Sequence, residues 1–301
     1  MQIIKPTTYN IDAILDSNTL PENDFAAWNA ATSYTVGTKV IRTTTHRIYQ
    51  NLIAGIDAGL PENTPSRWQD IAPTNAYAMF DSLSSTQSIG TTSFTAVLDP
   101  DSRLDSLTFT NLKGTQLTVS ATNDGAEEIY NQTFDLNQAS VTSWYDWFFE
   151  LFVQKRDVFI LDFPLAYMHP IITYTISTST GEQCGIGRVT YGRRYDSGHI
   201  EFGATLSIKD NSVKTTDANQ NVYLTKKTNV KLLSFNALLN QGDTMRISNL
   251  LRDLLSVPCV FIGYSGAGYE YLSAYGFYQN FTISTQNAVE NFVKFEIEEL
   301  T

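Results

Sequence analysis

One stretch of the sequence imitates the turn that carries a catalytic nucleophile. Gly263, Ser265 and Ala267 follow the Gly-x-Ser-x-Gly spacing of hydrolases, in which a serine on a sharp strand-to-helix turn attacks acyl groups. Ala267 replaces the second glycine, however, and no helical pattern or acid follows in the expected order. Gly266 and Gly268 do not complete a dinucleotide loop either, because no G-x-G-x-x-G register leads into a helix. A hairpin turn explains the stretch, and we predict no catalytic residue in it.

Metal-binding residues are too scattered to predict a site. The three histidines lie far apart without an i,i+4 pair, so neither a zinc site nor a histidine-based triad is expected. The acidic residues between 99 and 105 lack the glycine and the terminal glutamate of a calcium loop. We therefore predict no metal and no cofactor. The residues considered are His46, His169, His199, Asp99, Asp101 and Asp105.

Paired carboxylates are harder to recognise, because a glycan depolymerase can take them from different strands with no fixed spacing. Such enzymes usually contain long repetitive β-helix segments, and this sequence has no internal repeat. An enzyme is therefore the third choice among the function classes, and the chain is predicted to be non-enzymatic.

Length and composition predict a chain of several domains that is mainly β. A chain of 301 residues exceeds what one hydrophobic core usually holds, so two or three domains are expected. Charged residues make up only 17% of the chain, while Thr, Ser, Asn, Tyr and Phe are abundant. This profile suits exposed strands and turns better than long surface helices.

The formal net charge of -11 argues against nucleic-acid binding, which needs a cationic field to displace counterions from phosphates. Basic residues outnumber acidic ones locally, between 188 and 231. We interpret them as solvated strand faces or as a docking surface for an acidic neighbour. They are Arg188, Arg193, Arg194, Lys209, Lys214, Lys226, Lys227 and Lys231.

The cysteines and the hydropathy pattern indicate which cellular compartment suits the chain. Cys184 and Cys259 lie far apart without C-x-x-C spacing, which suits buried thiols in a bacterial cytoplasm, although one long-range disulfide stays possible. Residues 1–10 lack the charged and apolar regions of a signal peptide. No run of 18 apolar residues occurs, so no membrane span is expected.

The first organised region, residues 25–73, is predicted to be a small aromatic β module that follows an N-terminal arm at 1–24. Short β-prone runs alternate with turns, and Gly37 supplies the freedom that a tight turn needs. So few strands make a marginal core, which aromatic side chains would have to fill. Those side chains are Trp28, Tyr34, Tyr49 and Trp68.

This spacing resembles that of the small chitin-binding-like carbohydrate modules, with a Trp, a Tyr-x-x-Gly-x-x-Val run, a second Tyr and a closing Pro and Trp. The resemblance implies that Trp28, Tyr34, Tyr49 and Trp68 could stack on a glycan. In those modules the sugar lies on exposed aromatic rings just after the second tyrosine. Here residues 50–53 read Gln-Asn-Leu-Ile, without a tryptophan. The alternative is that all four aromatic residues are core.

Residues 74–192 are predicted to form a β-sandwich. Strand-like runs at 91–98, 104–109, 115–121 and 129–134 alternate apolar and polar residues between turns. Their order resembles a galactose-binding-like jelly roll, which implies a fold and no particular function. The aromatic run from 144 to 152 is interpreted as core or interface. The candidate assembly-interface residues are Trp144, Trp147, Phe148, Tyr275 and Phe277.

Residues 193–301 are predicted to be an α+β assembly domain. Strand-like runs at 202–208, 221–226 and 229–236 precede one amphipathic helix, which Asp243 or Thr244 could cap and which runs through residue 256. Pro258 ends that helix, and β alternation returns afterwards. The apolar face of the helix would consist of Ile247, Leu250, Leu251, Leu254 and Leu255.

The chain also resembles, over nearly its whole length, a family of tailed-bacteriophage virion proteins. This resemblance implies a structural component of the phage tail, near the tip, the collar or the fibre attachment, that is assembled in the bacterial host cytoplasm. It further implies several copies and contacts with other tail proteins. The alternative function is a host-surface glycan-binding adhesion protein. The residues that carry the resemblance are Trp28, Tyr34, Gly37, Tyr49, Trp68, Met79, Phe80, Asp81, Tyr275, Gly276, Phe277, Tyr278 and the terminal run 295–300.

Overall fold

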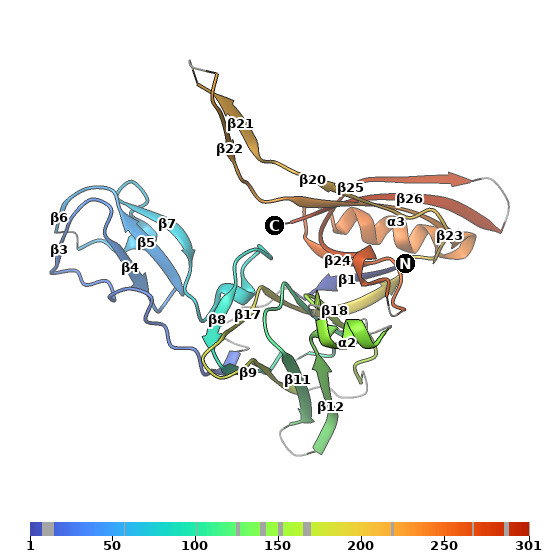
Figure 1. Cartoon of the computed structure of the whole chain (residues 1–301), viewed down its shortest axis with the longest axis horizontal. Coiled ribbons are helices and arrows are strands. Elements are labelled where there is room, and N and C mark those ends of the chain that lie inside the picture. The colour runs from blue at the N-terminus through green and yellow to red at the C-terminus, as the bar shows by residue number, and fades with distance from the viewer. Residues whose placement is uncertain are drawn as a thin grey trace.

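The computed structural model describes the chain as mainly β, with several sheets and one well-formed amphipathic helix. The multi-domain β-rich architecture predicted from the sequence is thus confirmed (Figure 1). The described residues are 1–7, 15–56, 58–100, 102–124, 127–138, 143–149, 153–164, 170–217, 220–266, 268–285 and 289–300.

A ten-stranded antiparallel sheet forms the centre of the molecule. It joins strands from both ends of the chain, so that the region predicted as a sandwich and the region predicted as an assembly domain share one sheet. Its order is β15 (Val158–Ile160), β10 (Ser106–Thr110), β18 (Arg188–Asp196), β1 (Gln2–Pro6), β24 (Cys259–Ile262), β25 (Ser273–Thr285), β26 (Glu290–Glu299), β23 (Val230–Asn240) and β19 (His199–Ile200), and β20 (Thr205–Lys209) also pairs with β23.

The first strand, β1, lies in the middle of this sheet, where it pairs with β18 on one side and β24 on the other. Successive side chains of a strand point to opposite faces. Ile3 therefore packs into the core beneath the helix, and Ile4 packs on the other face with Val260 and Tyr275. Residues 1–24 are thus not a free arm, and the expected boundary at 192/193 falls inside β18.

A five-stranded antiparallel sheet packs against the β10, β15 and β18 end of the large sheet and encloses the largest core. Leu117, Val119 and Ala121 alternate with half-buried polar residues, as the sequence predicts. The jelly-roll comparison stays a prediction. The five strands are β12 (Glu127–Asp135), β11 (Gln116–Asn123), β16 (Pro170–Ser177), β9 (Ser93–Leu98) and β2 (Leu15–Asn18); β17 (Gln183–Ile186) pairs with β8 (Ser88–Thr91), β13 (Asn137–Gln138) pairs with β14 (Val153–Gln154), and η2 spans Ala78–Phe80.

The aromatic module stands apart from the other sheets (Figure 1). Gly37 has φ +86° in the turn before β4, a conformation that glycine adopts without strain. Two small antiparallel sheets make up the module: β4 (Lys39–Arg42), β5 (Arg47–Asn51) and β7 (Trp68–Pro73) in one, and β3 (Ser33–Tyr34) with β6 (Gly55–Ile56) in the other, with η1 at Pro61–Asn63.

The amphipathic helix is α3 (Thr244–Asp253), and the single turn η3 (Gln241–Asp243) precedes it. It covers one face of the sheet formed by β23 to β26 (Figure 1). Ile247, Leu250, Leu251 and Leu254 are buried as predicted. The prediction for Leu255 is wrong: α3 ends before it, in a turn, so its side chain leaves the apolar face and is exposed.

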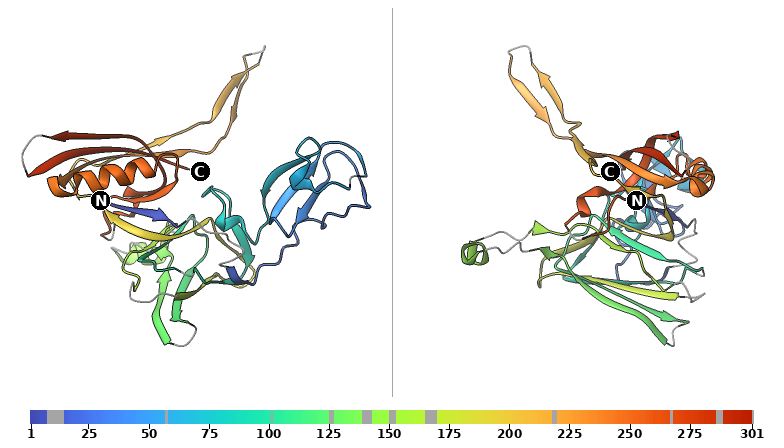
Figure 2. Two further views of the ribbon diagram at one scale, coloured as in Figure 1. Left: turned by 180° about the vertical axis from the view of Figure 1, so that it is seen from behind. Right: turned by 90° about the vertical axis from the view of Figure 1, so that its right-hand side faces the viewer.

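Two elements project from the body. The hairpin of β21 (Val213–Thr216) and β22 (Val222–Thr225) extends the β20 and β23 pair far beyond the sheet (Figure 1). The short helix α2 (Trp144–Phe149) stands clear of the sheets in the right-hand view of Figure 2. A separate short 3₁₀ helix, η4 (Glu270–Leu272), lies in the loop between β24 and β25.

The two cysteines are free thiols in separate cores: Cys184 lies in the sandwich and Cys259 beneath α3. Burial raises the pKa of the Cys259 thiol to about 12, and Lys5 acts weakly in the opposite direction. The folded chain therefore keeps a proton that the unfolded chain releases at about pH 8.5, so the free energy of unfolding should decrease as pH rises from there towards 12.

We expect iodoacetamide at about pH 8 to label Cys259 only after denaturation, as intact-mass spectrometry would detect. Rapid labelling of the folded chain would contradict this.

Candidate functional site

The four aromatic residues of the module build its core. Tyr34, Tyr49 and Trp68 are buried, and the Tyr34 and Trp68 rings meet edge to face with centroids 5.2 Å apart. Trp28 packs against them, and the Arg42 guanidinium lies 5.1 Å from the centre of its ring. A stacking platform needs an open ring face, which the buried rings of Tyr34, Tyr49 and Trp68 do not offer, so the glycan-stacking hypothesis is corrected for these three residues. Trp28 is half-buried with the Arg42 guanidinium over its ring, and its stacking role stays a prediction.

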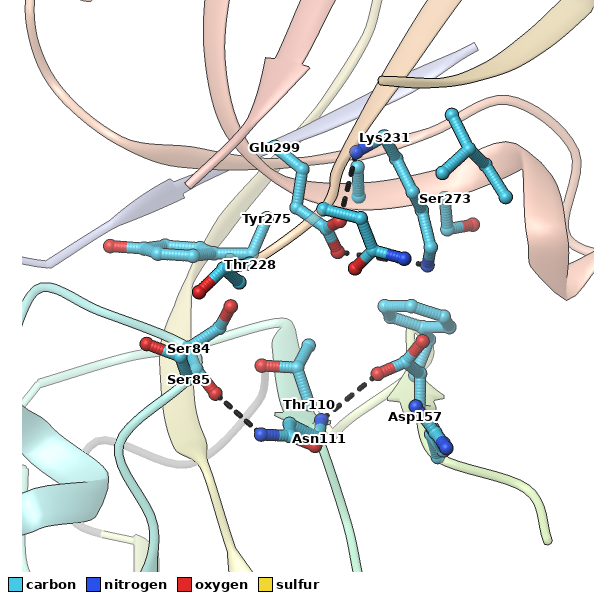
Figure 3. A pocket seen from close by; sticks show the side chains of 15 residues that line it. Ser84, Ser85, Thr110, Asn111, Asp157, Thr228, Lys231, Ser273, Tyr275 and Glu299 are labelled. Atoms are coloured by element: carbon cyan, nitrogen blue, oxygen red, sulfur yellow. Dashed lines mark hydrogen bonds and ion pairs between the residues drawn. The ribbon is translucent and has the colours of Figure 1, made fainter. Parts of the chain in front are cut away.

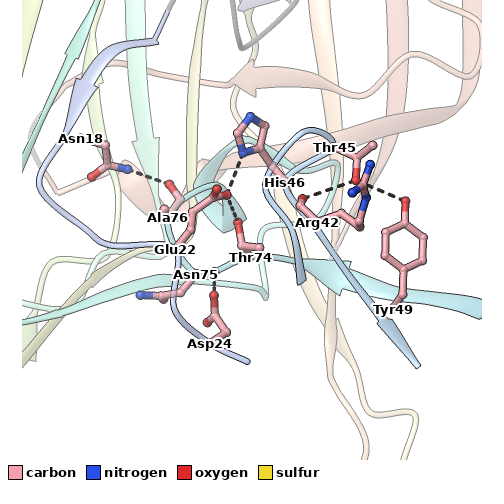
Figure 4. Close-up of polar contacts among 10 residues, drawn as sticks. All are labelled: Asn18, Glu22, Asp24, Arg42, Thr45, His46, Tyr49, Thr74, Asn75 and Ala76. Atoms are coloured by element: carbon pink, nitrogen blue, oxygen red, sulfur yellow. Dashed lines mark hydrogen bonds and ion pairs between the residues drawn. The ribbon is translucent and has the colours of Figure 1, made fainter. Parts of the chain in front are cut away.

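The module is tied to the body by a polar joint around Glu22. Its Oε1 accepts a hydrogen bond from the Thr74 hydroxyl at 2.6 Å and lies 2.7 Å from Nδ1 of His46 (Figure 4). Asn18 and Asp24, on the same stretch of chain, bond the backbone of Ala76 and Asn75. These contacts explain His46 as a structural residue of the joint.

The other chemical patterns do not converge on one place. Ser265 lies in the loop after β24, while Ala267 and His169 lie outside the described residues. Oδ1 of Asp105 accepts the backbone N–H of Arg194 at 2.6 Å, which gives that carboxylate a structural role, and Asp101 is not described. Within the described ranges, no group of three or more His, Cys, Asp or Glu side chains could hold a metal ion.

A cavity of about 370 Å³ lies where the two ends of the large sheet approach each other, and polar side chains surround it (Figure 3). Two carboxylates line this cavity, and each has an internal partner. Asp157 accepts the backbone N–H of Asn111 at 3.1 Å, and Glu299 lies 3.6 Å from the Lys231 ammonium. These bonds hold the chain segments around the cavity together, which gives both acids a structural role.

Of the predicted interface residues, Tyr275 is not on an open surface. Tyr275 is 3% exposed, the Arg188 guanidinium lies 4.4 Å from its ring centre, and its hydroxyl lies 3.4 Å from the carbonyl oxygen of Ser82. Phe277 is only partly exposed, in β25. The buried Tyr275 ring therefore does not form part of an assembly surface, and the role of Phe277 stays a prediction.

The aromatic residues of α2, in contrast, face solvent. Trp144 is 79% exposed, and Tyr145, Phe148 and Phe149 are exposed to a similar degree. The Tyr145 and Phe149 rings contact each other, with their centroids 4.8 Å apart. Trp147 is in the same helix, but its side chain lies outside the described residues. This cluster is the α2 aromatic patch, and its exposure favours the interface interpretation over the core interpretation.

The hairpin arm, residues 205–231, carries the second exposed apolar surface. Val222, Tyr223 and Leu224 are consecutive in β22 and all exposed, so both faces of the strand are open. Four lysines of the arm are exposed as well: Lys209, Lys214, Lys226 and Lys227. The sequence shows the lysines and its pattern predicts the strands, but it does not indicate that they stand away from the body.

Comparison with protein families, curated proteins and solved structures returned no match for this chain. In the described part of the chain, no helix is both long and apolar enough to cross a membrane.

Proposed function

We propose that this chain is a non-enzymatic structural subunit of a bacteriophage tail, which assembles with copies of itself and with other tail proteins. The observation that carries this proposal is the hairpin arm. It extends beyond the sheet (Figure 2). Its strand β22 has exposed apolar side chains on both faces.

Contact with another subunit would stabilise an arm of this kind. A two-stranded hairpin is at best marginally stable in water by itself. Leaving Val222, Tyr223 and Leu224 open to water forfeits the free energy that their burial would contribute. Contact with a neighbouring subunit removes both costs, and long exposed strand edges favour such pairing.

The charges of the arm suit another copy of this chain as the partner. The arm contains five lysines and two aspartates, whereas the whole chain has a formal net charge of -11. Residues 115–154 contain six carboxylates and no Lys or Arg. This segment includes the edge strand β12 and the α2 aromatic patch. A basic, apolar arm and an acidic, aromatic segment are complementary in charge and in hydrophobicity.

Placement in a phage tail is supported by the resemblance of the sequence to tailed-phage virion proteins. Subunits of such assemblies are present in several copies, and rigid β domains with projecting elements suit that role.

The arm is tested by Leu224→Asp, which places a charge on an exposed apolar side chain without altering the core. We expect self-association of the full chain, measured by sedimentation velocity, to weaken by about 30-fold or more, the effect of losing an interface anchor. The folded monomer should keep its thermal stability, since Leu224 is 71% exposed.

The matched control is Leu255→Asp, the same change at a side chain that is 64% exposed and lies after α3. Association of this variant should equal that of the unaltered chain. If Leu224→Asp and Leu255→Asp associate equally well, or if the unaltered chain stays monomeric at high concentration, assembly through the arm is refuted.

A further inference from the structure

A second cavity, of about 480 Å³, opens at the edge of the large sheet. One wall is formed by β19 and the residues after it, and the other by the loop between β24 and β25. Its size lies within the range of about 300–1,000 Å³ that is usual for small-molecule sites. Four aromatic side chains line it: Phe202, Tyr264, Tyr269 and Tyr271.

These rings contribute little to the core. Tyr264, Tyr269 and Tyr271 are 46–56% exposed, and none of them belongs to a buried cluster. Phe202 is fully exposed. Exposed aromatic rings that line one cavity form an apolar surface that a ligand could cover.

The tyrosines are held in place without a ligand. The Tyr264 and Tyr269 rings meet edge to face at 5.1 Å, and the Tyr269 and Tyr271 rings lie 6.2 Å apart with planes 30° from parallel. Backbone hydrogen bonds close the loop, from Gly263 to Leu272 and from Leu272 to Tyr269. Binding would therefore cost little ordering of these side chains.

The loop is also anchored to a distant part of the chain. Glu270 accepts the backbone N–H of Gly268 at 2.9 Å and lies 3.6 Å from the ammonium of Lys155. This arrangement fixes the end of the loop that carries Tyr269 and Tyr271, so the cavity has a defined wall.

Polar groups lie on the opposite wall. His199 and Glu201 both line the cavity, and the backbone N–H of Glu201 bonds the carbonyl oxygen of Asn236 at 2.9 Å. The carboxylate of Glu201 can accept hydrogen bonds from two hydroxyl groups, and the imidazole of His199 can donate or accept one. A few polar groups opposite aromatic rings match a ligand with hydroxyls on its edges and apolar C–H groups on its faces.

We infer that this cavity binds a neutral, pyranose-containing glycan. The negative π faces of the tyrosine rings attract the weakly positive C–H groups of a sugar ring. Glu201 in the cavity and the net charge of -11 disfavour acidic sugars. The site is separate from the aromatic module and from the arm, and it would give a structural subunit a contact with a glycan surface. Many copies in one assembly would make weak single sites effective.

The inference is tested by saturation-transfer NMR and calorimetry of the full chain with maltotetraose and cellotetraose, and with tetragalacturonate as the acidic probe. We expect at least one neutral tetrasaccharide to bind and the acidic one not to bind. Tyr269→Ala should weaken that binding by about tenfold or more, as removal of a central aromatic anchor does. Tyr269→Phe keeps the ring and should retain most of the affinity.

The matched control is Tyr223→Ala, at a similarly exposed tyrosine of the arm, which should leave glycan binding unchanged. Each variant is checked by thermal melting, so that a loss of binding is not a loss of folding. Three outcomes would overturn the inference: no binding of either neutral tetrasaccharide, equal binding by Tyr269→Ala, or loss of self-association in Tyr269→Ala, which would assign the cavity to a neighbouring copy. None of these bears on the Leu224→Asp test, so the two proposals fail independently.

Discussion

Replacing Trp68 by alanine should unfold the aromatic module and leave the remaining sheets folded. The Trp68 side chain is 1% exposed and packs against Tyr34, Val40 and Tyr49. Truncating a buried tryptophan costs about 3–5 kcal/mol, which is a large share of the stability that so small a core provides. Hydrogen–deuterium exchange, resolved by peptide, should show loss of protection in residues 25–73 only.

Trp144→Ala serves as the control for Trp68→Ala, because it removes the same side chain from a solvent-exposed position. Its exchange pattern should match that of the unaltered chain. Intact protection of the module in Trp68→Ala would contradict the assignment of these aromatic residues to its core and would revive the stacking-platform hypothesis.

Replacing Ile3 by aspartate should destabilise the whole body of the protein. Ile3 has no exposed surface, and β1 joins β18 to β24 in the middle of the ten-stranded sheet. A carboxylate at this position would be buried without a partner, so we expect the free energy of unfolding to fall by about 4 kcal/mol or more. Chemical denaturation followed by circular dichroism measures this change.

The control for Ile3→Asp is Ile208→Asp, in which the same substitution falls on an exposed residue of the arm. Its unfolding midpoint should stay close to that of the unaltered chain. A normal midpoint for Ile3→Asp would mean that β1 does not hold the two parts of the large sheet together.

Local patterns predicted much of the fold. The alternation at Leu117, Val119 and Ala121 and the helical spacing at Ile247, Leu250 and Leu251 both match the buried faces of the structure. These patterns depend on a few neighbouring residues, so a sequence displays them directly. The predicted C-terminal end of the helix, at residue 256, lies beyond the end of α3 at Asp253, because the helical spacing of apolar residues continues into the turn that follows.

Long-range pairing could not be predicted. Ile3 and Ile4 are two apolar residues in a polar stretch, and their partners lie near residues 194 and 260. Nothing in residues 1–10 indicates which strands they meet. For this reason β1 was expected to belong to an arm, and the sandwich and assembly regions were expected to be separate domains.

The sequence also does not show which apolar residues are exposed in the folded chain. Val222, Tyr223 and Leu224 have the composition of a buried strand, and only the structure shows them in a projecting hairpin. The sequence pattern does not identify the tyrosines of the second cavity, because the glycines around Ser265 match the spacing of a catalytic turn instead. The density of tyrosine at 264, 269 and 271 was the signal that could have identified them.

The most direct test of the proposed function is cryo-electron microscopy of tailed-phage particles produced from a genome that encodes this chain. We predict density for several copies in the tail, with residues 205–231 of each copy in contact with a neighbouring subunit and with Tyr223 and Leu224 buried there. Absence of the chain from the particle, or an arm that faces solvent in every copy, would contradict assembly through the arm.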